Sequence, residues 1–323
     1  MRTIVCHEFG PPASLLVEDI DAPVPGPGDV ALDIRAAGVN YVDALLVTGR
    51  YQMKPPLPFT PGSDVAGVVA AIGGGVEGWK VGDHAVAMVG LGGFAERVVL
   101  PASMLFRVPR DVDLGRAAGC IQSYATMLFA YTRRTTLERG QTVLVLGAGG
   151  GIGLAAIDLA VALGARVIAA ASSDAKLVAA RAAGAVETIA YESEDLKTRA
   201  RALSGGGVDV VVDPVGGRHA DAALRTLAAG GRYLVLGFAG GDIPKLPLNQ
   251  VLLSNRTVVG VDWGAWSFRE PEANRELIRE MLAMVADGRL HPPAPVAHPL
   301  AVAGRVLTDL LERRVTGKAV LRP

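Results

Sequence analysis

Short apolar runs separated by glycine and proline dominate the first third of the chain. Residues 30–36, 64–72, 84–89 and 95–100 are such runs. Strands of a barrel or sandwich typically have this length and this punctuation. The pattern therefore predicts an all-β region over residues 1 to about 115.

The pattern changes at about Gly119, where helical segments and apolar strand segments begin to alternate. The predicted strands lie at residues 142–146, 166–171, 208–213, 231–237 and 257–261. Such alternation is typical of a doubly wound parallel sheet with helices on both faces. The expected fold class is therefore α/β, with a separate β region before the sheet.

Two domains follow from this change, as a length of 323 residues also suggests. The alternating region, residues 119–264, is predicted to be inserted into a domain made of residues 1–118 and 265–323. The returning segment is expected to contain two amphipathic helices and a final strand, at 272–286, 301–313 and 319–321.

The segment from Thr142 to Ser173 has the strongest pattern in the chain. An apolar run over residues 142–146 is long enough for a buried parallel strand and too short for a buried helix. Glycines follow it at once, then a helical segment to about Leu163, then the next strand. This order predicts a strand, a glycine turn, a helix and a second parallel strand.

The glycines have the spacing G-x-x-G-x-x-G rather than the common G-x-G-x-x-G. Glycine allows a sharp turn and a close approach to a pyrophosphate, and the N-terminus of the following helix offers unpaired N–H groups. The segment therefore predicts a dinucleotide site. The residues expected around the pyrophosphate are Gly147, Gly150, Gly151, Ile152 and Gly153.

The end of the second strand indicates which dinucleotide binds. An NAD site usually places Asp or Glu there to accept from the ribose 2′-OH, but the chain has Ser172 and Ser173, and Asp174 comes late. Hydroxyls together with Lys176 suit a 2′-phosphate. Lys176 is equally well explained as a solvated helix residue, and the missing carboxylate favours NADPH.

Composition excludes several classes of protein. Lys plus Arg and Asp plus Glu are 32 each, so a net charge of zero gives no electrostatic footprint for nucleic acid or an anionic membrane. No apolar run resembles a signal peptide or reaches spanning length. Cys6 and Cys120 lie in apolar contexts and are expected to be buried rather than disulfide-bonded. We expect a globular cytoplasmic protein.

Several motifs in a fixed order carry a family resemblance across essentially the whole chain. They are AAGVNYVD (36–43), LPFTPGSDVAGVV (57–69), VEGWKVGDHA (76–85), the segment from Thr142, and RAAGA (181–185). In these the chain resembles the medium-chain dehydrogenase/reductase superfamily, most of all its zinc-free quinone oxidoreductase branch. The resemblance implies a GroES-like β-barrel catalytic domain joined to a Rossmann domain, with the active site in the cleft between them.

The zinc members of that superfamily have cysteine and histidine ligands where this chain, by the resemblance, has Asn40, Ser63 and Gln122. None of these side chains is a zinc thiolate or imidazole. The short segment from Met88 to Phe94 also leaves no room for a four-cysteine lobe. We therefore predict no metal site.

Without zinc, alcohol oxidation lacks its Lewis acid, which favours reduction of an activated acceptor. A quinone or a conjugated enone spreads the developing negative charge itself. By the resemblance, Asn40 lies at the nicotinamide and the substrate, and Tyr51 falls where related enoyl reductases carry a catalytic tyrosine. Tyr51 either donates to the developing oxyanion or only lines the cleft.

Further cofactor contacts are implied by the resemblance. Thr126 is expected near the pyrophosphate or nicotinamide, Tyr191 over the adenosine phosphate, and Arg314 at the 2′-phosphate. Each has a structural alternative, respectively a packed helix residue, a surface aromatic and a favourable charge at a helix C-terminus. Strand-end turns facing the nicotinamide contain Gly216, Gly237 and Phe238.

The sequence thus predicts an NADPH-dependent, zinc-independent reductase of quinones or enones. One alternative is an enoyl-thioester reductase of the same fold, for which Tyr51 would matter most. Another is a non-catalytic NADPH-binding redox sensor or RNA binder. The resemblance also implies a homodimer that joins through strands near residues 257–261.

Overall fold

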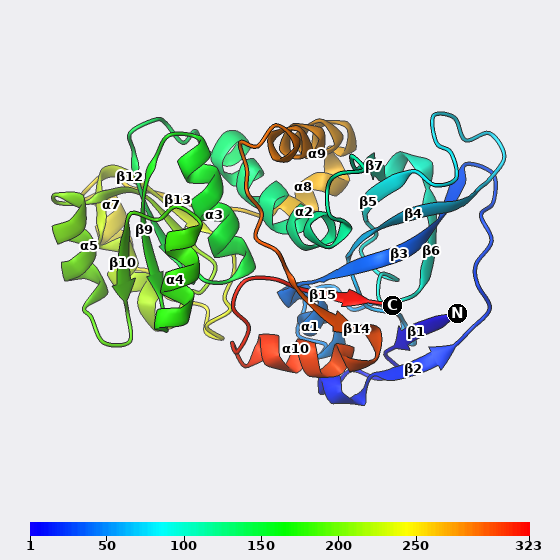
Figure 1. Cartoon of the computed structure of the whole chain (residues 1–323). Helices are drawn as coiled ribbons and strands as arrows, with labels where there is room; N and C mark the ends of the chain where they lie inside the picture. The colour runs from blue at the N-terminus through cyan, green and yellow to red at the C-terminus, as the bar shows by residue number, and fades with distance from the viewer. The chain divides into compact units, whose positions relative to one another are not determined.

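The computed structural model describes all 323 residues and divides into two compact units (Figure 1). Unit 1 comprises residues 1–122 and 293–323, and unit 2 comprises residues 123–292. The first boundary lies close to the one expected. The second corrects our expectation, because residues 265–292 belong to unit 2 rather than to the first domain.

Residues 265–292 join unit 2 through their side-chain and backbone contacts. The rings of Trp266 and Phe129 lie 4.7 Å apart between centroids. The backbone N–H of His291 donates to Asp158 Oδ2 at 2.7 Å. The segment contains most of helix α8 (Trp263–Arg269) and all of α9 (Pro271–Ala286).

Unit 1 is built on a seven-stranded sheet in the order β14-β15-β3-β4-β5-β7, with β6 also paired to β3 (Figure 1). Its strands are β3 (Asp29–Val39), β4 (Asp64–Ile72), β5 (His84–Met88), β6 (Arg97–Pro101), β7 (Leu105–Arg107), β14 (Val296–Pro299) and β15 (Ala319–Arg322). Neighbours are antiparallel except β14 and β15. Strands β1 (Arg2–Val5) and β2 (Leu16–Asp19) form a separate pair.

Helices α1 and α10 cover the core of unit 1. Leu46 of α1 and Val306 of α10 are buried in one apolar cluster with Leu32 and Phe94. The expectation of an all-β region missed α1, because its seven residues are too few to show a helical period. The helical elements of this unit are η1 (Pro12–Ser14), α1 (Tyr41–Val47), η2 (Ala102–Met104), η5 (Leu300–Val302), α10 (Ala303–Leu311) and the first part of α2 (Leu114–Phe129).

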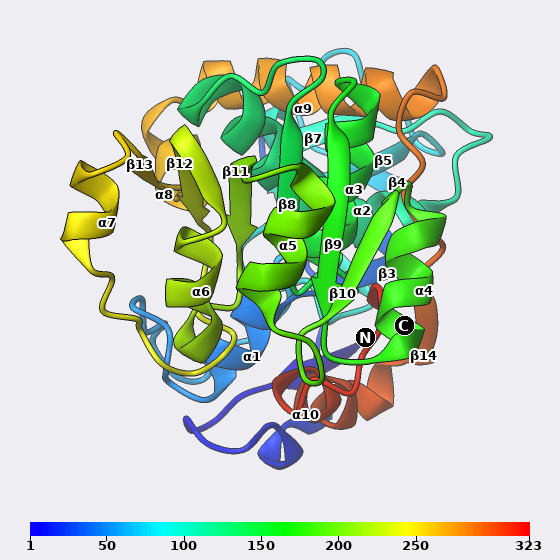
Figure 2. The ribbon, with the colours of Figure 1, turned by 90° about the vertical axis from the view of Figure 1, so that its left-hand side faces the viewer.

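Six parallel strands in the order β10-β9-β8-β11-β12-β13 form the sheet of unit 2, which confirms the doubly wound α/β prediction (Figure 2). They are β8 (Thr142–Leu146), β9 (Arg166–Ala171), β10 (Glu187–Ala190), β11 (Val208–Asp213), β12 (Leu227–Val235) and β13 (Thr257–Gly260). Strands β8, β9 and β11 have the predicted bounds. Strand β12 begins before residue 231, because the ladder continues across two glycines through a shift in register.

The connecting helices lie on both faces of this sheet (Figure 2). Helices α3 (Gly151–Ala162) and α4 (Asp174–Ala182) pack on one face. On the other face, Leu196 and Ala223 close over Leu144 and Ile168. The remaining elements are η3, a π-helical turn (Ala130–Arg134), α5 (Leu196–Ser204), η4 (Gly217–His219), α6 (Ala220–Leu224) and α7 (Leu248–Leu252). Strand order reverses between β8 and β11, where ligands of such sheets bind.

Cys6 and Cys120 are free and buried, as predicted. None of the helices combines the length and the hydrophobicity needed to cross a bilayer.

Candidate functional site

The turn after β8 brings the predicted glycines to the carboxyl edge of the unit 2 sheet. Gly147 adopts φ +58°, and Gly150 is the N-cap of α3 without a side chain to cap it. A Cβ on Gly153 would lie 2.4 Å from the carbonyl oxygen of Gly147, so only glycine lets the helix begin this close to the strand. The first N–H groups of α3, at Gly151 and Ile152, are therefore available to an anion.

Hydroxyls and an ammonium lie beside the glycine turn. A Cβ on Gly149 would lie 2.4 Å from Cβ of Lys176, and Lys176 Nζ is 3.4 Å from Ser172 Oγ. Ser173 is the N-cap of α4, yet its hydroxyl makes no capping bond. Asp174 is exposed in the first turn of α4. The structure thus brings Ser172 and Lys176 together and leaves no carboxylate at the end of β9.

Tyr191 follows β10 on the same edge of the sheet. Its backbone N–H donates to the carbonyl oxygen of Ala171, the last residue of β9, at 3.3 Å. Its ring lies 4.3 Å from the ring of His219 between centroids. The phenol is therefore held near the residues that follow β9, and His219 is a neighbour that the sequence did not indicate.

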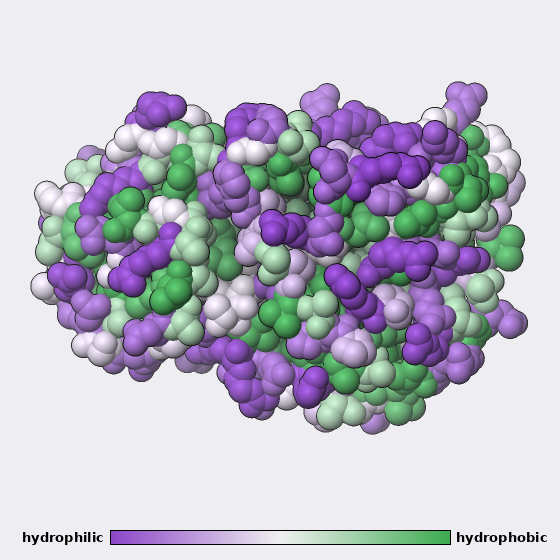
Figure 3. Space-filling model, viewed as in Figure 1, coloured by the Kyte–Doolittle hydropathy of each residue, from purple (hydrophilic) through white to green (hydrophobic).

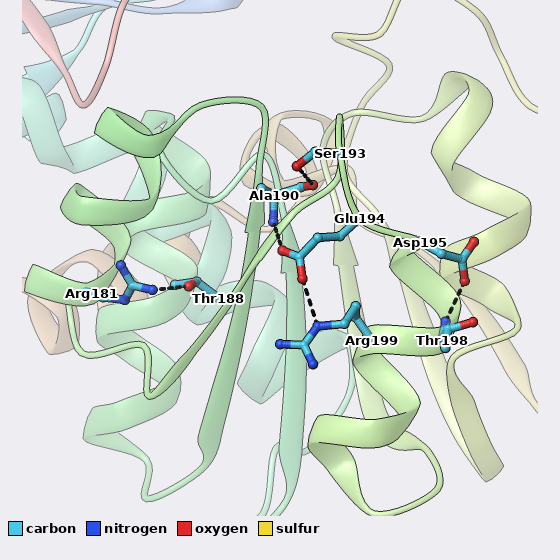
Figure 4. Close-up of polar contacts among 8 residues, drawn as sticks. All are labelled: Arg181, Thr188, Ala190, Ser193, Glu194, Asp195, Thr198 and Arg199. Atoms are coloured by element: carbon cyan, nitrogen blue, oxygen red, sulfur yellow. Dashed lines mark hydrogen bonds and ion pairs between the residues drawn. The ribbon is translucent and has the colours of Figure 1, made fainter.

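The loop after Tyr191 is fixed by two carboxylates (Figure 4). Glu194 accepts from the N–H of Ala190 at 2.8 Å and from Nε of Arg199 at 2.8 Å. Asp195 caps α5 by accepting from the N–H of Thr198 at 2.8 Å. These bonds define the backbone at the point where the chain leaves the carboxyl edge.

Asp213, which sequence reasoning missed, organises the turn after β11. Its Oδ1 accepts from the N–H groups of Val215 and Gly216, both at 2.8 Å. The hydroxyl of Tyr233 donates to its Oδ2. Burial and the Asp213 charge raise the pKa of Tyr233. An acidic residue at the end of a buried apolar strand, directly before Pro-Val-Gly-Gly, was the available signal.

The turns after β11 and β12 meet through the predicted glycines. Gly216 adopts φ +64°, and a Cβ there would lie 2.8 Å from Cδ1 of Phe238. The N–H of Gly240 donates to the carbonyl oxygen of Val215 at 2.6 Å. Gly216, Gly237 and Phe238 are thus gathered at one edge of the sheet.

Thr126 and Arg314 lie on elements other than these strand-end turns. Thr126 lies on α2 within unit 2 and is partly exposed. Arg314 belongs to unit 1, where its Nε donates to Asp309 Oδ1 at 2.9 Å and its guanidinium also pairs with Glu312. The charge of Arg314 is therefore already engaged by two carboxylates of its own unit.

A buried polar cluster surrounds Asn40 in unit 1, and strand register explains it. Val39 of β3 pairs with Ala319 of β15, and Gly38 pairs with Asp64 of β4. The end of β3 and the starts of β4 and β15 therefore lie side by side in the sheet. We call the group the Asn40 cluster, and its members are Asn40, Asp43, Ser63, Asp64 and Lys318.

Every polar atom of the Asn40 side chain has a partner in this cluster. Nδ2 donates to Asp64 Oδ2 at 2.7 Å and to Ser63 Oγ at 3.2 Å. Oδ1 accepts from Lys318 Nζ at 2.5 Å. The backbone N–H of Asn40 donates to Asp43 Oδ2 at 2.8 Å, which also fixes the start of α1. Asn40 is only 5% exposed.

Burial is the largest cause of the pKa shifts in the Asn40 cluster. It raises the pKa of Asp43 to about 7 and that of Asp64 to about 6, although hydrogen bonds and the Lys318 charge oppose the shift. It lowers the pKa of Lys318, against the attraction of both carboxylates. Burial also raises the pKa of the nearby Cys120 thiol to about 12. Two carboxylates thus face one ammonium.

Tyr51 lies in the bend after α1, partly buried against the unit 1 core. Its backbone N–H donates to the carbonyl oxygen of Leu45 at 3.1 Å. Its hydroxyl has no hydrogen-bond partner in the chain. The hydroxyl is therefore free to donate to another molecule.

The donors at Asn40, Ser63 and Gln122 do not suit zinc, because they are amides and a hydroxyl rather than thiolates or imidazoles. The Lys318 ammonium occupies the side of Asn40 that carries Oδ1. No three His, Cys, Asp or Glu side chains lie close enough together to hold a metal ion.

Two family models match the chain. An alcohol dehydrogenase GroES-like domain matches residues 26–110, and a zinc-binding dehydrogenase domain matches residues 151–285. The first match confirms the GroES-like character predicted for the N-terminal region. The second covers the region that starts with α3 in the unit 2 sheet.

Individual relatives cover almost the whole chain. Quinone oxidoreductase-like protein 2 of Rattus norvegicus is 37% identical over 99% of this chain and 91% of its own length. A mycobacterial protein solved in complex with NADPH is 32% identical with a TM-score of 0.91, and each chain is fully covered. The Escherichia coli quinone oxidoreductase in complex with NADPH is 26% identical with a TM-score of 0.92, again with full coverage of both.

The raised pKa of Asp43 predicts a pH dependence of stability. Because the folded carboxyl holds its proton up to about pH 7, whereas the unfolded carboxyl releases it near 3.8, stability falls as the pH rises between these values. Asp43→Asn should remove this component, of the order of a few kcal/mol, and so reduce the slope of stability against pH between pH 5 and about pH 7, while the component from Asp64 remains. Urea unfolding at a series of pH values measures it.

The matched control for that experiment is Asp19→Asn, which changes an exposed carboxylate on β2. It should keep the wild-type slope of unfolding free energy against pH. An Asp43→Asn protein with the wild-type slope would show that the folded Asp43 carboxyl does not hold its proton over this pH range.

Proposed function

Because the chain belongs to the medium-chain dehydrogenase/reductase superfamily, in its zinc-free quinone oxidoreductase branch, we propose that it transfers hydride from NADPH to a quinone or an α,β-unsaturated carbonyl without zinc. The observation that carries the proposal is the arrangement at the carboxyl edge of the unit 2 sheet. There an uncapped helix N-terminus lies beside two hydroxyls and one ammonium, with no carboxylate at the end of β9.

Two groups of residues at this edge suit two different parts of NADPH. The N–H groups at the start of α3 suit the pyrophosphate, since a helix N-terminus stabilises an anion. Ser172, Ser173 and Lys176 suit the 2′-phosphate, with Tyr191 beside them. The turns held by Asp213, which carry Gly216 and the Gly237-Phe238 pair, form the part of the edge proposed for the nicotinamide. Thr126 and Arg314 stay proposed contacts.

The chemistry then needs little beyond positioning. NADPH supplies the hydride when bound, and the acceptor takes it at a ring carbon or at the β-carbon of the enone. The acceptor oxygen gains negative charge and then a proton from water or from an acid of the protein. We propose the free hydroxyl of Tyr51 as that donor, and Asn40 as the amide that faces the reacting groups.

Zinc independence is part of the proposal. It is supported by the amide and hydroxyl donors at Asn40, Ser63 and Gln122 and by the ammonium of Lys318 against Asn40 Oδ1. An alcohol substrate would need a Lewis acid to lower its pKa. A quinone or enone needs none, because conjugation spreads its charge.

We further propose that two copies join through β13. This strand is the last of its sheet and has no partner on one side. The apolar residues exposed in this region of unit 2 are Ile243, Leu248, Leu252, Leu253, Val258 and Phe268. On the face viewed in Figure 3, by contrast, polar and apolar residues are interspersed. A second copy would satisfy the strand edge and cover the apolar side chains.

The two free, buried thiols support a reducing compartment, for which we propose the cytoplasm.

The first experiment follows NADPH absorbance with a panel of quinones, simple enones and one enoyl-thioester. We expect turnover of quinones or enones that a chelator does not reduce. Turnover of the thioester alone would favour the enoyl-thioester reductase. NADPH binding without any turnover would favour a sensor or RNA-binding role, and loss of turnover with chelator would contradict zinc independence.

Lys176→Ala tests the cofactor assignment. Losing a charged partner of the 2′-phosphate should weaken NADPH binding roughly 10–100-fold and leave NADH binding within about 2-fold, as measured by fluorescence titration. Lys197→Ala, which removes an exposed lysine on α5, is the control and should change neither. Equal losses for both dinucleotides would rule out the 2′-phosphate contact.

The dimer is tested by sedimentation of the wild type and of the double variant Leu252→Glu/Leu253→Glu. The wild type should sediment as two chains and the variant as one, because two buried carboxylates oppose the interface. Val178→Glu places the same charge on an exposed apolar position of α4 and should stay dimeric. A monomeric wild type would contradict the proposal.

A further inference from the structure

Lys318 is the one cation of the Asn40 cluster, and it lies 278 positions after Asn40 in the chain. It precedes β15, and the pairing of Ala319 with Val39 sets it beside Asn40. Its Nζ donates to the carbonyl oxygen of Val39 at 3.1 Å and to Asn40 Oδ1 at 2.5 Å. Two groups on β3 and its extension therefore hold the ammonium.

The charges around Asn40 allow its amide one orientation. The oxygen faces the Lys318 ammonium, and the NH₂ group faces the Asp64 carboxylate and the Ser63 hydroxyl. A rotated amide would set NH₂ against the ammonium and oxygen against the carboxylate. Each of these contacts would be repulsive in a site that excludes water.

The same ammonium balances the charge of the two buried carboxylates, Asp43 and Asp64. Asp43 Oδ1 and Asp64 Oδ1 are buried and have no hydrogen-bond partner. The charged and titratable groups that face one another here are Asp43 on α1, Asp64 on β4, Lys318 before β15 and Cys120 on α2. Only Lys318 supplies positive charge, so removing it affects both the carboxylates and the amide.

We propose that Lys318 is a positioning residue for hydride transfer, which acts by fixing the side-chain amide of Asn40 between its ammonium and Asp64. The proposal rests on the proposed function, in which Asn40 faces the reacting groups. In this proposal Lys318 acts through its contact with Asn40 rather than by binding the acceptor or the cofactor. The amide is held by charges on both sides of β3, from Asp64 on β4 and from Lys318 just before β15, so its orientation is set before any ligand binds.

The test compares steady-state kinetics of Lys318→Met, Asn40→Ala and the double variant. Lys318→Met should lower kcat for the best quinone or enone roughly 10–100-fold and leave the Kd for NADPH unchanged. If Lys318 acts through Asn40, the double variant has the same kcat as Asn40→Ala within about 2-fold. Losses that multiply in the double variant would overturn the proposal.

Two further variants test whether the loss in kcat comes only from a disturbed fold. Lys318→Met/Asp64→Asn removes one charge of each sign, and it should fold like the wild type yet keep the loss in kcat. Full activity in this variant would overturn the proposal. Lys80→Met, at an exposed lysine of unit 1, should retain wild-type kcat.

A readout without turnover separates this proposal from the proposed function. In the NMR spectrum of ¹⁵N-labelled protein, the Asn40 side-chain NH₂ should give two distinct, slowly exchanging signals in the wild type. In Lys318→Met they should shift and exchange faster. Unchanged signals would overturn the role of Lys318 even if the wild type reduces quinones. Changed signals in a protein that reduces no acceptor would refute the proposed function alone.

Discussion

A carboxylate buried in protein must be paired, and that constraint determines how the elements of this chain are joined. Asp64 is matched by Asn40 and the Lys318 charge, Asp213 by two backbone N–H groups and Tyr233, and Asp158 by Tyr124 and the backbone of His291. Each carboxylate lies where different elements meet. Breaking one such set costs several kcal/mol, against a total stability of roughly 5–15 kcal/mol.

The unit 2 sheet was predictable because its information is local. Strands β8, β9 and β11 are buried on both faces, so each appears in the sequence as an uninterrupted apolar run between turns. Strand β12 was predicted too short, since glycines hid its first residues. The second domain boundary was wrong for another reason. Residues 265–292 pack in unit 2 through contacts with residues more than a hundred positions earlier, which no window can show.

The site residues also fall into two groups, those that local sequence indicates and those that only the fold brings together. The glycine turn, Ser172 and Lys176 are close in sequence, so their spacing already indicates an anion site next to a helix N-terminus. Asp213 acts on its own turn, but its partner Tyr233 is 20 positions away. The ammonium against Asn40 comes from 278 positions away. Only the register of β15 on β3 brings it there, and that register is a property of the folded sheet.

The divided course of unit 1 also has a consequence for how the protein is made. Strand β15 lies between β14 and β3, yet residues 293–323 are synthesised only after all of unit 2. Unit 2 is one continuous segment and can complete its sheet during synthesis, whereas the end of β3 waits with an open edge. The carboxylates beside Asn40 therefore meet their only cation after unit 2 has been synthesised. A nascent chain truncated before that point would therefore present an unfinished sheet to chaperones.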